Sequence, residues 1–443
     1  MTRDPYIATA AFFTELLNQG LTHILVSPGS RSTALAISAQ QTIGLKVMVH
    51  LDERSAGFWA LGIAKASNRP VVLICTSGTA AANYLPAVAE AHFSEIPLIV
   101  ITADRPPELQ DRGAGQTINQ SGIYGAHVRW SCELPIANDV APEWFQSTAA
   151  RSFQIATGSR PGPVHLNWPL REPLEPINQV LPKVSSKPIM LTRQASVINP
   201  QALEVLQNVA NHENGLLLAG PMSKDQSEAV ASFCIKTGWP LLAEPLSQLR
   251  RQLPGVNVIS NYDHLLRTPW VERNVPTAVV RIGQPMTSKP LRLWLERHRP
   301  QHLLIGDGIA WTDASTTATA LLDTSTEILG QVSGSGGSQD WSKKWVAADN
   351  AARIAINKVL DAGPLLEASI AREFGRSLPN MTVLYVSNSM PVRDIDSFFE
   401  VSSSNLTCFG NRGASGIDGL ISSAAGVASS GRTTTLFIGD LAF

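Results

Sequence analysis

The sequence predicts an α/β fold made of three doubly wound parallel-sheet domains in series. Short apolar runs recur along the 443 residues, and segments in which apolar residues have helical spacing separate them. Runs that are apolar on both faces are typical of parallel strands covered by helices on two sides. Two connections, one rich in proline and one rich in glycine and serine, divide this alternation into three parts.

The first predicted domain is residues 1–180. It opens with an amphipathic helix over residues 1–20, whose acidic residues argue against a signal peptide. Helices are also expected over residues 54–67 and 80–95. Strands are expected at residues 22–27, 45–51, 70–76, 97–103 and 164–168.

The second predicted domain, residues 197–340, follows a proline-rich linker at residues 181–196. Its strands are expected at residues 215–220, 240–245, 277–283 and 302–308. Residues 330–340, "GQVSGSGGSQD", are expected to form a flexible connection to the third domain.

The third predicted domain, residues 341–443, resumes the alternation near residue 362. Helices are expected over residues 363–378 and 416–430, and strands at residues 382–387, 406–410 and 434–440. The last of these strands is of the buried type and is followed only by "LAF". We therefore expect this domain to be incomplete and the chain to be part of a longer protein.

Composition and charge narrow the classes of partner. Lysine and arginine (35) nearly balance aspartate and glutamate (36) and are scattered, which argues against a nucleic-acid surface. The four cysteines lie far apart, so neither a disulfide framework nor a structural zinc site is expected. No apolar run reaches the roughly 20 residues of a membrane span. We expect a cytoplasmic protein that binds small molecules or copies of itself.

Two segments offer candidate ligand-binding residues at strand ends. Glu53 stands between a strand and a helix, where open α/β sheets bind ligands, although a first-turn acid can also simply stabilise its helix. Ser77 and Gly78 lie in a small-residue turn that could cradle an anion, yet it has no P-loop lysine. Tight packing between helix and strand is the alternative for that turn.

Several further turns carry arginine after a strand. Each could recognise a carboxylate, and solvated charge clusters are the alternative. Together they favour a substrate with more than one carboxylate. The residues concerned are Ser30 and Arg31 in "SPGSRST", Arg105 and Gln116 in "ITADRPPELQDRGAGQTINQ", Asn388, Ser389 and Arg393 in "SNSMPVRDID", and Asn411 and Arg412 in "GNRGASGIDG".

Two glycine-aspartate turns have different interpretations. Asp307 in "GDG" looks like the opening of a thiamin diphosphate and magnesium motif, but the asparagine pair that should follow is absent. It is therefore interpreted as a turn or helix-cap acid. Asp440 in "FIGDLAF" lies in the appropriate domain, close to the end of the chain. Spacing of the H-E-x-x-H or G-x-S-x-G kind is absent, which argues against metalloproteases and serine hydrolases.

The quoted segments, taken in order with "HLDERSAGFWALGIAKAS" and "CTSGTAAANYLPAVAEA", closely resemble the 2-succinyl-5-enolpyruvyl-6-hydroxy-3-cyclohexene-1-carboxylate (SEPHCHC) synthase family. The resemblance covers most of the chain. It implies the architecture of thiamin diphosphate enzymes, with pyrimidine-binding, central and diphosphate-binding domains. It also implies that 2-oxoglutarate is decarboxylated and that the succinyl carbanion adds to isochorismate, in menaquinone or phylloquinone biosynthesis.

The same resemblance implies roles for individual residues. Glu53 would hydrogen-bond the cofactor's aminopyrimidine and act in catalysis, and Ile417 would hold the cofactor bent. Asp440, beside Gly439, would bind Mg²⁺ or Mn²⁺, and Ser77 and Gly78 would contact the cofactor. The substrate-binding residues would be Ser30, Arg31, Arg105, Gln116, Lys289, Asn388, Ser389, Arg393 and Arg412.

The resemblance further implies a homodimer or a dimer of dimers, because in this superfamily the active site lies between two subunits. The chain departs from the family pattern at Pro290, where some members have arginine beside the lysine, and Arg292 is the candidate substitute. The remaining metal ligands would lie beyond Phe443. Another thiamin diphosphate carboligase or decarboxylase, or a truncated non-catalytic homologue that binds carboxylates, stays open at this point.

Overall fold

The computed structural model describes residues 5–137, 139–176, 187–192, 198–223, 226–308, 310–334, 336–401 and 403–443. Most of the linker predicted at residues 181–196 lies outside the described residues. The chain forms two compact units. The first holds the described residues up to 192 with Asn411–Thr434 and Phe443, and the second holds those from 198 to Gly410 with Thr435–Ala442.

A six-stranded sheet forms the centre of the first unit. Its strand order is β2-β1-β3-β4-β6-β5, and the strands pair in parallel. The five predicted strands are confirmed, and β5 was not predicted because its sequence, "WSCE", has no continuous apolar run. The strands are β1 (His23–Val26), β2 (Lys46–Val49), β3 (Val71–Cys75), β4 (Leu98–Asp104), β5 (Trp130–Glu133) and β6 (Pro163–Pro169).

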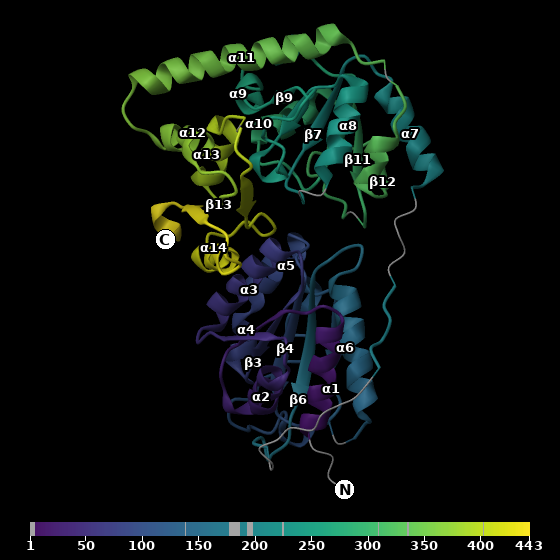
Figure 1. Ribbon diagram of the computed structural model, residues 1–443, viewed down its shortest axis with the longest axis vertical. Coiled ribbons are helices and arrows are strands. Elements are labelled where there is room, and N and C mark those ends of the chain that lie inside the picture. The colour runs from purple at the N-terminus through teal and green to yellow at the C-terminus, as the bar shows by residue number, and fades with distance from the viewer. Residues whose placement is uncertain are drawn as a thin grey trace. The chain divides into compact units, whose positions relative to one another are not determined.

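Helices cover both faces of this sheet (Figure 1). Alternate residues of β3 point to opposite faces, so Ile74 packs with α1 and α6 whereas Leu73 packs with α3 and α5. The helices predicted over residues 54–67 and 80–95 are both present, although the second is divided at Tyr84 into α4 and α5. The helices of this unit are α1 (Pro5–Asn18), α2 (Thr33–Gln41), α3 (Glu53–Ser67), α4 (Thr79–Asn83), α5 (Leu85–Phe93), α6 (Pro142–Ala156) and α14 (Leu420–Ala428).

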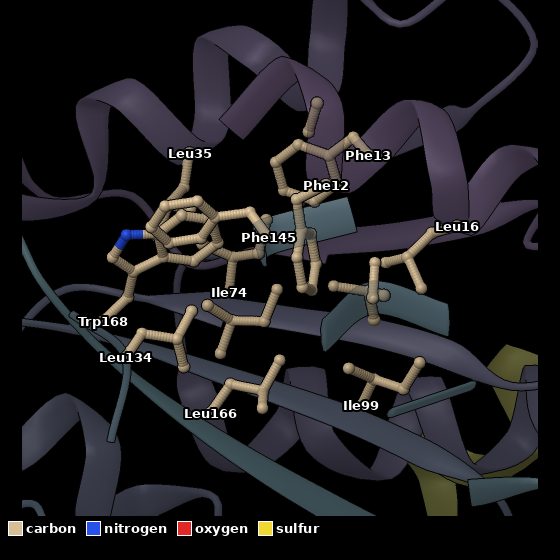
Figure 2. Packing of buried hydrophobic residues seen from close by; sticks show 14 of the residues in the cluster. Phe12, Phe13, Leu16, Leu35, Ile74, Ile99, Leu134, Phe145, Leu166 and Trp168 are labelled. Atoms are coloured by element: carbon tan, nitrogen blue, oxygen red, sulfur yellow. The ribbon is translucent and has the colours of Figure 1, made fainter. Parts of the chain in front are cut away.

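Aromatic side chains fill the core between the sheet and helices α1 and α6 (Figure 2). Phe145 of α6 stacks on Trp168 of β6 with ring centroids 5.1 Å apart, and Phe12 of α1 meets the same indole edge-on at 5.2 Å. Such pairs add to the burial of large apolar surfaces. They anchor the carboxyl end of β6 to both helices.

The second unit contains two sheets, of order β12-β11-β10-β7-β8-β9 and β14-β13-β15. The seven strands predicted here are confirmed, while the short strands β9 and β12 were not predicted. The first sheet consists of β7 (Gly215–Ala219), β8 (Leu241–Ala243), β9 (Val258–Ile259), β10 (Ala278–Ile282), β11 (Gln301–Gly306) and β12 (Ala320–Asp323). The smaller sheet consists of β13 (Val383–Val386), β14 (Thr407–Gly410) and β15 (Thr434–Phe437).

Two helices of this unit lie in segments for which the sequence predicted another structure. Helix α11 (Gln339–Ala362) starts inside the segment predicted to be flexible, because Ser338 caps it and Trp341 and Trp345 are buried among apolar residues of the first sheet. Helix α13 (Met390–Phe398) was interpreted as part of a turn. The other helices are α7 (Pro200–Ala210), α8 (Ser227–Thr237), α9 (Tyr262–Leu265), α10 (Lys289–His298) and α12 (Glu367–Ser377).

The predicted fold class, parallel α/β sheets with interleaved helices, is confirmed, and the third sheet is small. The domain boundaries at residues 180, 197 and 340 stay predictions. Among the helices that the structure describes, none has the length and apolarity needed to cross a membrane.

Candidate active site

Four loops of the first unit leave the same edge of its sheet. They follow β1, β2, β3 and β4, and the carboxyl ends of parallel strands face one edge, where open α/β sheets bind their ligands. Ser30, Glu53, Ser77 and Arg105 lie in or directly after these loops. The parallel topology therefore brings together residues that the sequence suggested separately.

Glu53 is the first residue of α3, but it does not cap that helix. The cap is Asp52, whose carboxylate accepts a hydrogen bond from the Ser55 amide at 2.7 Å. Burial raises the pKa of the Cys75 thiol and of the Tyr84 hydroxyl, and in both cases the nearby charge of Glu53 adds to the rise. The Glu53 carboxylate thus lies near the buried end of β3 and is available for a role other than capping.

The turn after β3 is held by two glutamines. Gly78 has φ 89°, and a Cβ atom there would lie 2.9 Å from Cγ of Gln116, so the turn requires glycine. The Gly78 amide donates to Gln120 Oε1 at 2.7 Å, and Gln116 Nε2 donates to the Ser77 carbonyl at 2.9 Å. The sequence suggested that the Gly78 amide could bind an anion. In the structure this amide instead donates its hydrogen bond to a side chain of the protein.

Two guanidinium groups lie close together beside this turn. Arg31 is buried and donates to the Leu170 carbonyl at 3.0 Å and to Glu172 at 3.2 Å, while its Nε has no hydrogen-bond partner. Arg105 donates to Ser77 Oγ. Burial lowers the pKa of Arg105, and the positive charge of Arg31 lowers it further. Two neighbouring guanidinium groups, one of them with an unused N–H donor at Arg31 Nε, suit an anionic ligand.

A buried polar network behind these arginines was not predicted. Gln120 Nε2 donates to Asn167 Oδ1 at 3.0 Å, and Asn167 Nδ2 donates to Asp104 at 2.8 Å. Thr102 bridges the Asn167 amide oxygen and the ring of His165, both at 2.8 Å. The signal was present in "VHLNW", where two polar residues interrupt an otherwise apolar buried strand.

The second unit carries four of the predicted substrate residues. Lys289, the first residue of α10, is exposed, as is Arg393 on α13. Asn388 is buried at the end of β13, and Ser389 has φ 70°, a backbone conformation that costs energy outside glycine and often marks functional sites. Arg292, the candidate substitute beside Pro290, is paired with Glu296.

The remaining predicted residues either follow β15 or precede α14. Gly439 and the exposed Asp440 follow β15, and Asp440 begins a 3-10 helix that ends at Ala442. Arg412, half-buried, and Ile417, exposed, lie in the segment before α14, within the first unit. Among the described residues, no group of three or more histidine, cysteine, aspartate or glutamate side chains is placed to hold a metal ion.

Comparison with known proteins bears on this geometry. Residues 8–123 match the family described as thiamine pyrophosphate enzyme, N-terminal TPP binding domain, and residues 183–386 match the middle domain of thiamine pyrophosphate enzymes. A SEPHCHC synthase of Geobacillus thermodenitrificans is 38% identical over 98% of this chain and 77% of its own length. A SEPHCHC synthase of Listeria monocytogenes is 39% identical over 100% of this chain and 80% of its own length. A SEPHCHC synthase of Chloroflexus aurantiacus is 38% identical over 98% of this chain and 76% of its own length.

The chain belongs to the SEPHCHC synthase family. The resemblance seen in the sequence is thereby confirmed, and with it thiamin diphosphate and a divalent metal as the cofactors of the family to which the chain belongs. The residues of the first unit fit the pyrimidine half of such a cofactor. Glu53 presents a carboxylate outside the helix cap, beside a turn where only glycine fits. Which residues of this SEPHCHC synthase family member contact cofactor and substrates stays a prediction.

Proposed function

We propose that this protein is a thiamin diphosphate-dependent carboligase. It decarboxylates 2-oxoglutarate and transfers the remaining succinyl unit by 1,4-addition to isochorismate, which gives SEPHCHC and carbon dioxide in menaquinone or phylloquinone biosynthesis. The relatives that match nearly the whole chain are SEPHCHC synthases, and this supports the proposal. Within the structure, the observation that carries it is the position of Glu53.

Glu53 is assigned the catalytic role. When bound, thiamin diphosphate supplies the carbanion chemistry that decarboxylation and ligation require. The Glu53 carboxylate accepts and returns a proton at a ring nitrogen of the aminopyrimidine, which requires a site poor in water. Glu53 is half-buried, and its charge acts on the buried thiol of Cys75 and the buried hydroxyl of Tyr84, which supports a position at the edge of the apolar core. Ser77 and Gly78 are assigned to cofactor contact at the neighbouring turn.

Arg31 and Arg105 are assigned to the carboxylates of the substrates, with Ser30 and Gln116 beside them. Both substrates carry two carboxylates, so a pair of adjacent guanidinium groups has a partner for each charge. The Nε donor of Arg31 that lacks a partner supports this role, because a buried unpaired donor costs free energy until a ligand satisfies it.

The other assignments are also proposals. Asp440 and Gly439 serve the Mg²⁺ or Mn²⁺ ion and the diphosphate, and Ile417 holds the cofactor in its bent shape. The positive φ of Ser389 and the exposure of Arg393 and Lys289 support contact with a ligand rather than with the core. The substrate residues assigned outside the first sheet are Lys289, Asn388, Ser389, Arg393 and Arg412.

We further propose that the protein acts as a homodimer or a dimer of dimers. The segment Asn411–Ser415 is bound by Lys65 and Glu90 in its own chain. Lys65 lies near the end of α3, about 18 Å of helical rise from Glu53 at its start. A second copy is a direct source of an Arg412 segment for the site that contains Glu53, which supports an active site shared between subunits.

The test combines the protein with isochorismate, 2-oxoglutarate, thiamin diphosphate and Mg²⁺, and follows isochorismate loss and carbon dioxide release. The proposal expects both in the wild-type protein and neither in Glu53→Gln. Asp52→Asn is the matched control, since asparagine keeps an acceptor for the Ser55 amide, and it should remain near wild-type rate. Absence of turnover in the wild type would refute the proposed function. A normal rate in Glu53→Gln would show that Glu53 does not have the assigned catalytic role.

A further inference from the structure

A buried carboxylate anchors the segment that carries Arg412. Glu90, on α5, has a side chain that is 3% exposed. Its Oε1 accepts from the Gly413 amide at 2.9 Å, and its Oε2 accepts from the Ala414 amide at 2.7 Å and from the Ser415 amide at 3.3 Å. Three successive backbone amides thus converge on one carboxylate, as they do in backbone nests that bind anions.

The carboxylate also has partners at the C-cap of its own helix and on α3. Ser94 Oγ donates to Oε1 of Glu90 at 2.6 Å, and the ammonium group of Lys65 lies 3.9 Å from the same oxygen. Lys65 in turn donates to Asn411 Oδ1 at 2.8 Å. Burial lowers the pKa of Lys65 to about 8, against the opposing effect of Glu90. A buried charge pair of this kind costs desolvation, so stability alone is a weak reason for its presence.

The backbone of the segment fits this anchor closely. A Cβ atom on Gly413 would lie 2.6 Å from the carbonyl oxygen of Glu90 and 2.6 Å from the Ser94 amide, so only glycine permits the approach. Asn411 is buried, and its Nδ2 donates to Ser423 Oγ on α14 at 3.1 Å. The residues on both sides of Arg412 are therefore fixed, while Arg412 itself is only half-buried.

We propose that Glu90 and Lys65 are positioning residues for Arg412. Their pair fixes the backbone of Asn411–Ser415, and the fixed backbone holds the Arg412 guanidinium where it binds a substrate carboxylate. The proposal rests on the proposed function. It adds to that function two residues that do not touch substrate or cofactor.

The test is Glu90→Gln in the full-length protein. Glutamine has nearly the same shape, but its NH₂ group would face a backbone amide that also donates, so at least one of the three hydrogen bonds is lost. Glu95→Gln is the matched control, because Glu95 lies just beyond α5 and pairs with Arg160 instead. Hydrogen exchange of peptides covering residues 411–419 should become at least tenfold faster in Glu90→Gln and stay unchanged in Glu95→Gln. Wild-type exchange in Glu90→Gln would overturn the anchor.

A double-mutant cycle separates positioning from general destabilisation. Glu90→Gln should lower kcat/KM for the carboxylate substrates about 10- to 50-fold when Arg412 is present, and less than about twofold in an Arg412→Ala background. An equal loss in both backgrounds, or no loss, would overturn the positioning role. If Glu90→Gln does not fold, Ser94→Ala carries the same cycle with an expected loss of about threefold. A wild-type protein without turnover refutes the proposed function, whereas the exchange measurement still decides the anchor.

Discussion

The close crossing of α3 and α14 gives the sharpest quantitative prediction. In the first unit the two helices lie against each other (Figure 1), and Gly62 of α3 faces the backbone of α14. A Cβ atom on Gly62 would lie 2.0 Å from the carbonyl oxygen of Ser423 and 3.0 Å from the Val427 amide. The blocking atoms are backbone, so no side chain can rotate away.

Gly62→Ala therefore combines two opposing effects. Alanine gains about 1 kcal/mol over glycine in a helix interior. The methyl group forces the helices apart by roughly 1 Å, and overpacking of this kind costs about 1–3 kcal/mol, to which the weakened contacts of the crossing are added. We expect a net loss of about 1–2 kcal/mol in the free energy of unfolding of the first unit.

The assay is denaturant unfolding combined with hydrogen exchange of α3 and α14. Gly375→Ala is the matched control, because the nearest atoms to a Cβ on Gly375 in α12 lie 3.5 Å away, and it should stabilise the protein by about 0.5–1 kcal/mol. Glycine-to-alanine substitution is thus predicted to change the free energy of unfolding in opposite directions at these two helical positions. A neutral or stabilising Gly62→Ala would refute the close crossing.

Three further predictions concern charge. Arg31→Ala should lower kcat/KM for isochorismate about 10- to 100-fold, while Glu172→Gln leaves it near wild type; an unchanged value in Arg31→Ala would exclude a substrate contact. Burial lowers the pKa of His165 to about 3, so below pH 6.5 the unfolded chain takes up a proton that the folded chain refuses. Between pH 6.5 and pH 4, the free energy of unfolding of the wild type should therefore fall by about 3 kcal/mol more than that of His165→Gln. Parallel plots of unfolding free energy against pH for the two proteins would contradict this. Asp396→Asn leaves the buried Arg250 without its charge partner and should cost about 3 kcal/mol or more by denaturant unfolding of the second unit; a loss under 1 kcal/mol would show that the carbonyls around Arg250 suffice.

The sequence by itself determined the fold class and the positions of most strands. Continuous apolar runs such as "VVLIC" and "LIVITA" can be satisfied only by burial on both faces, so local composition decides their structure. The strands and helices that were missed lack this property. Strand β5 alternates polar and apolar residues at a sheet edge. Helix α11 is ordered through Trp341 and Trp345, whose partners, such as Gly215 and Trp270, are distant in sequence.

The sequence also indicated the candidate site, because chemistry-bearing residues followed the predicted strands. It could not assign their hydrogen bonds. Asp52 and Glu53 are adjacent acids, and only the structure shows that the cap belongs to Asp52. Likewise, only the structure shows that the Gly78 amide is engaged by Gln120.

Tertiary structure alone decided the long-range polar contacts. Glu90 and the amides of Gly413, Ala414 and Ser415 are separated by over three hundred residues, and neither segment carries a local pattern that points to the other. The physical reason is that apolar burial is encoded residue by residue, whereas the partner of a buried charge is chosen only when distant segments meet. Most strands could therefore be predicted from the sequence, while the anchor of Arg412 could not.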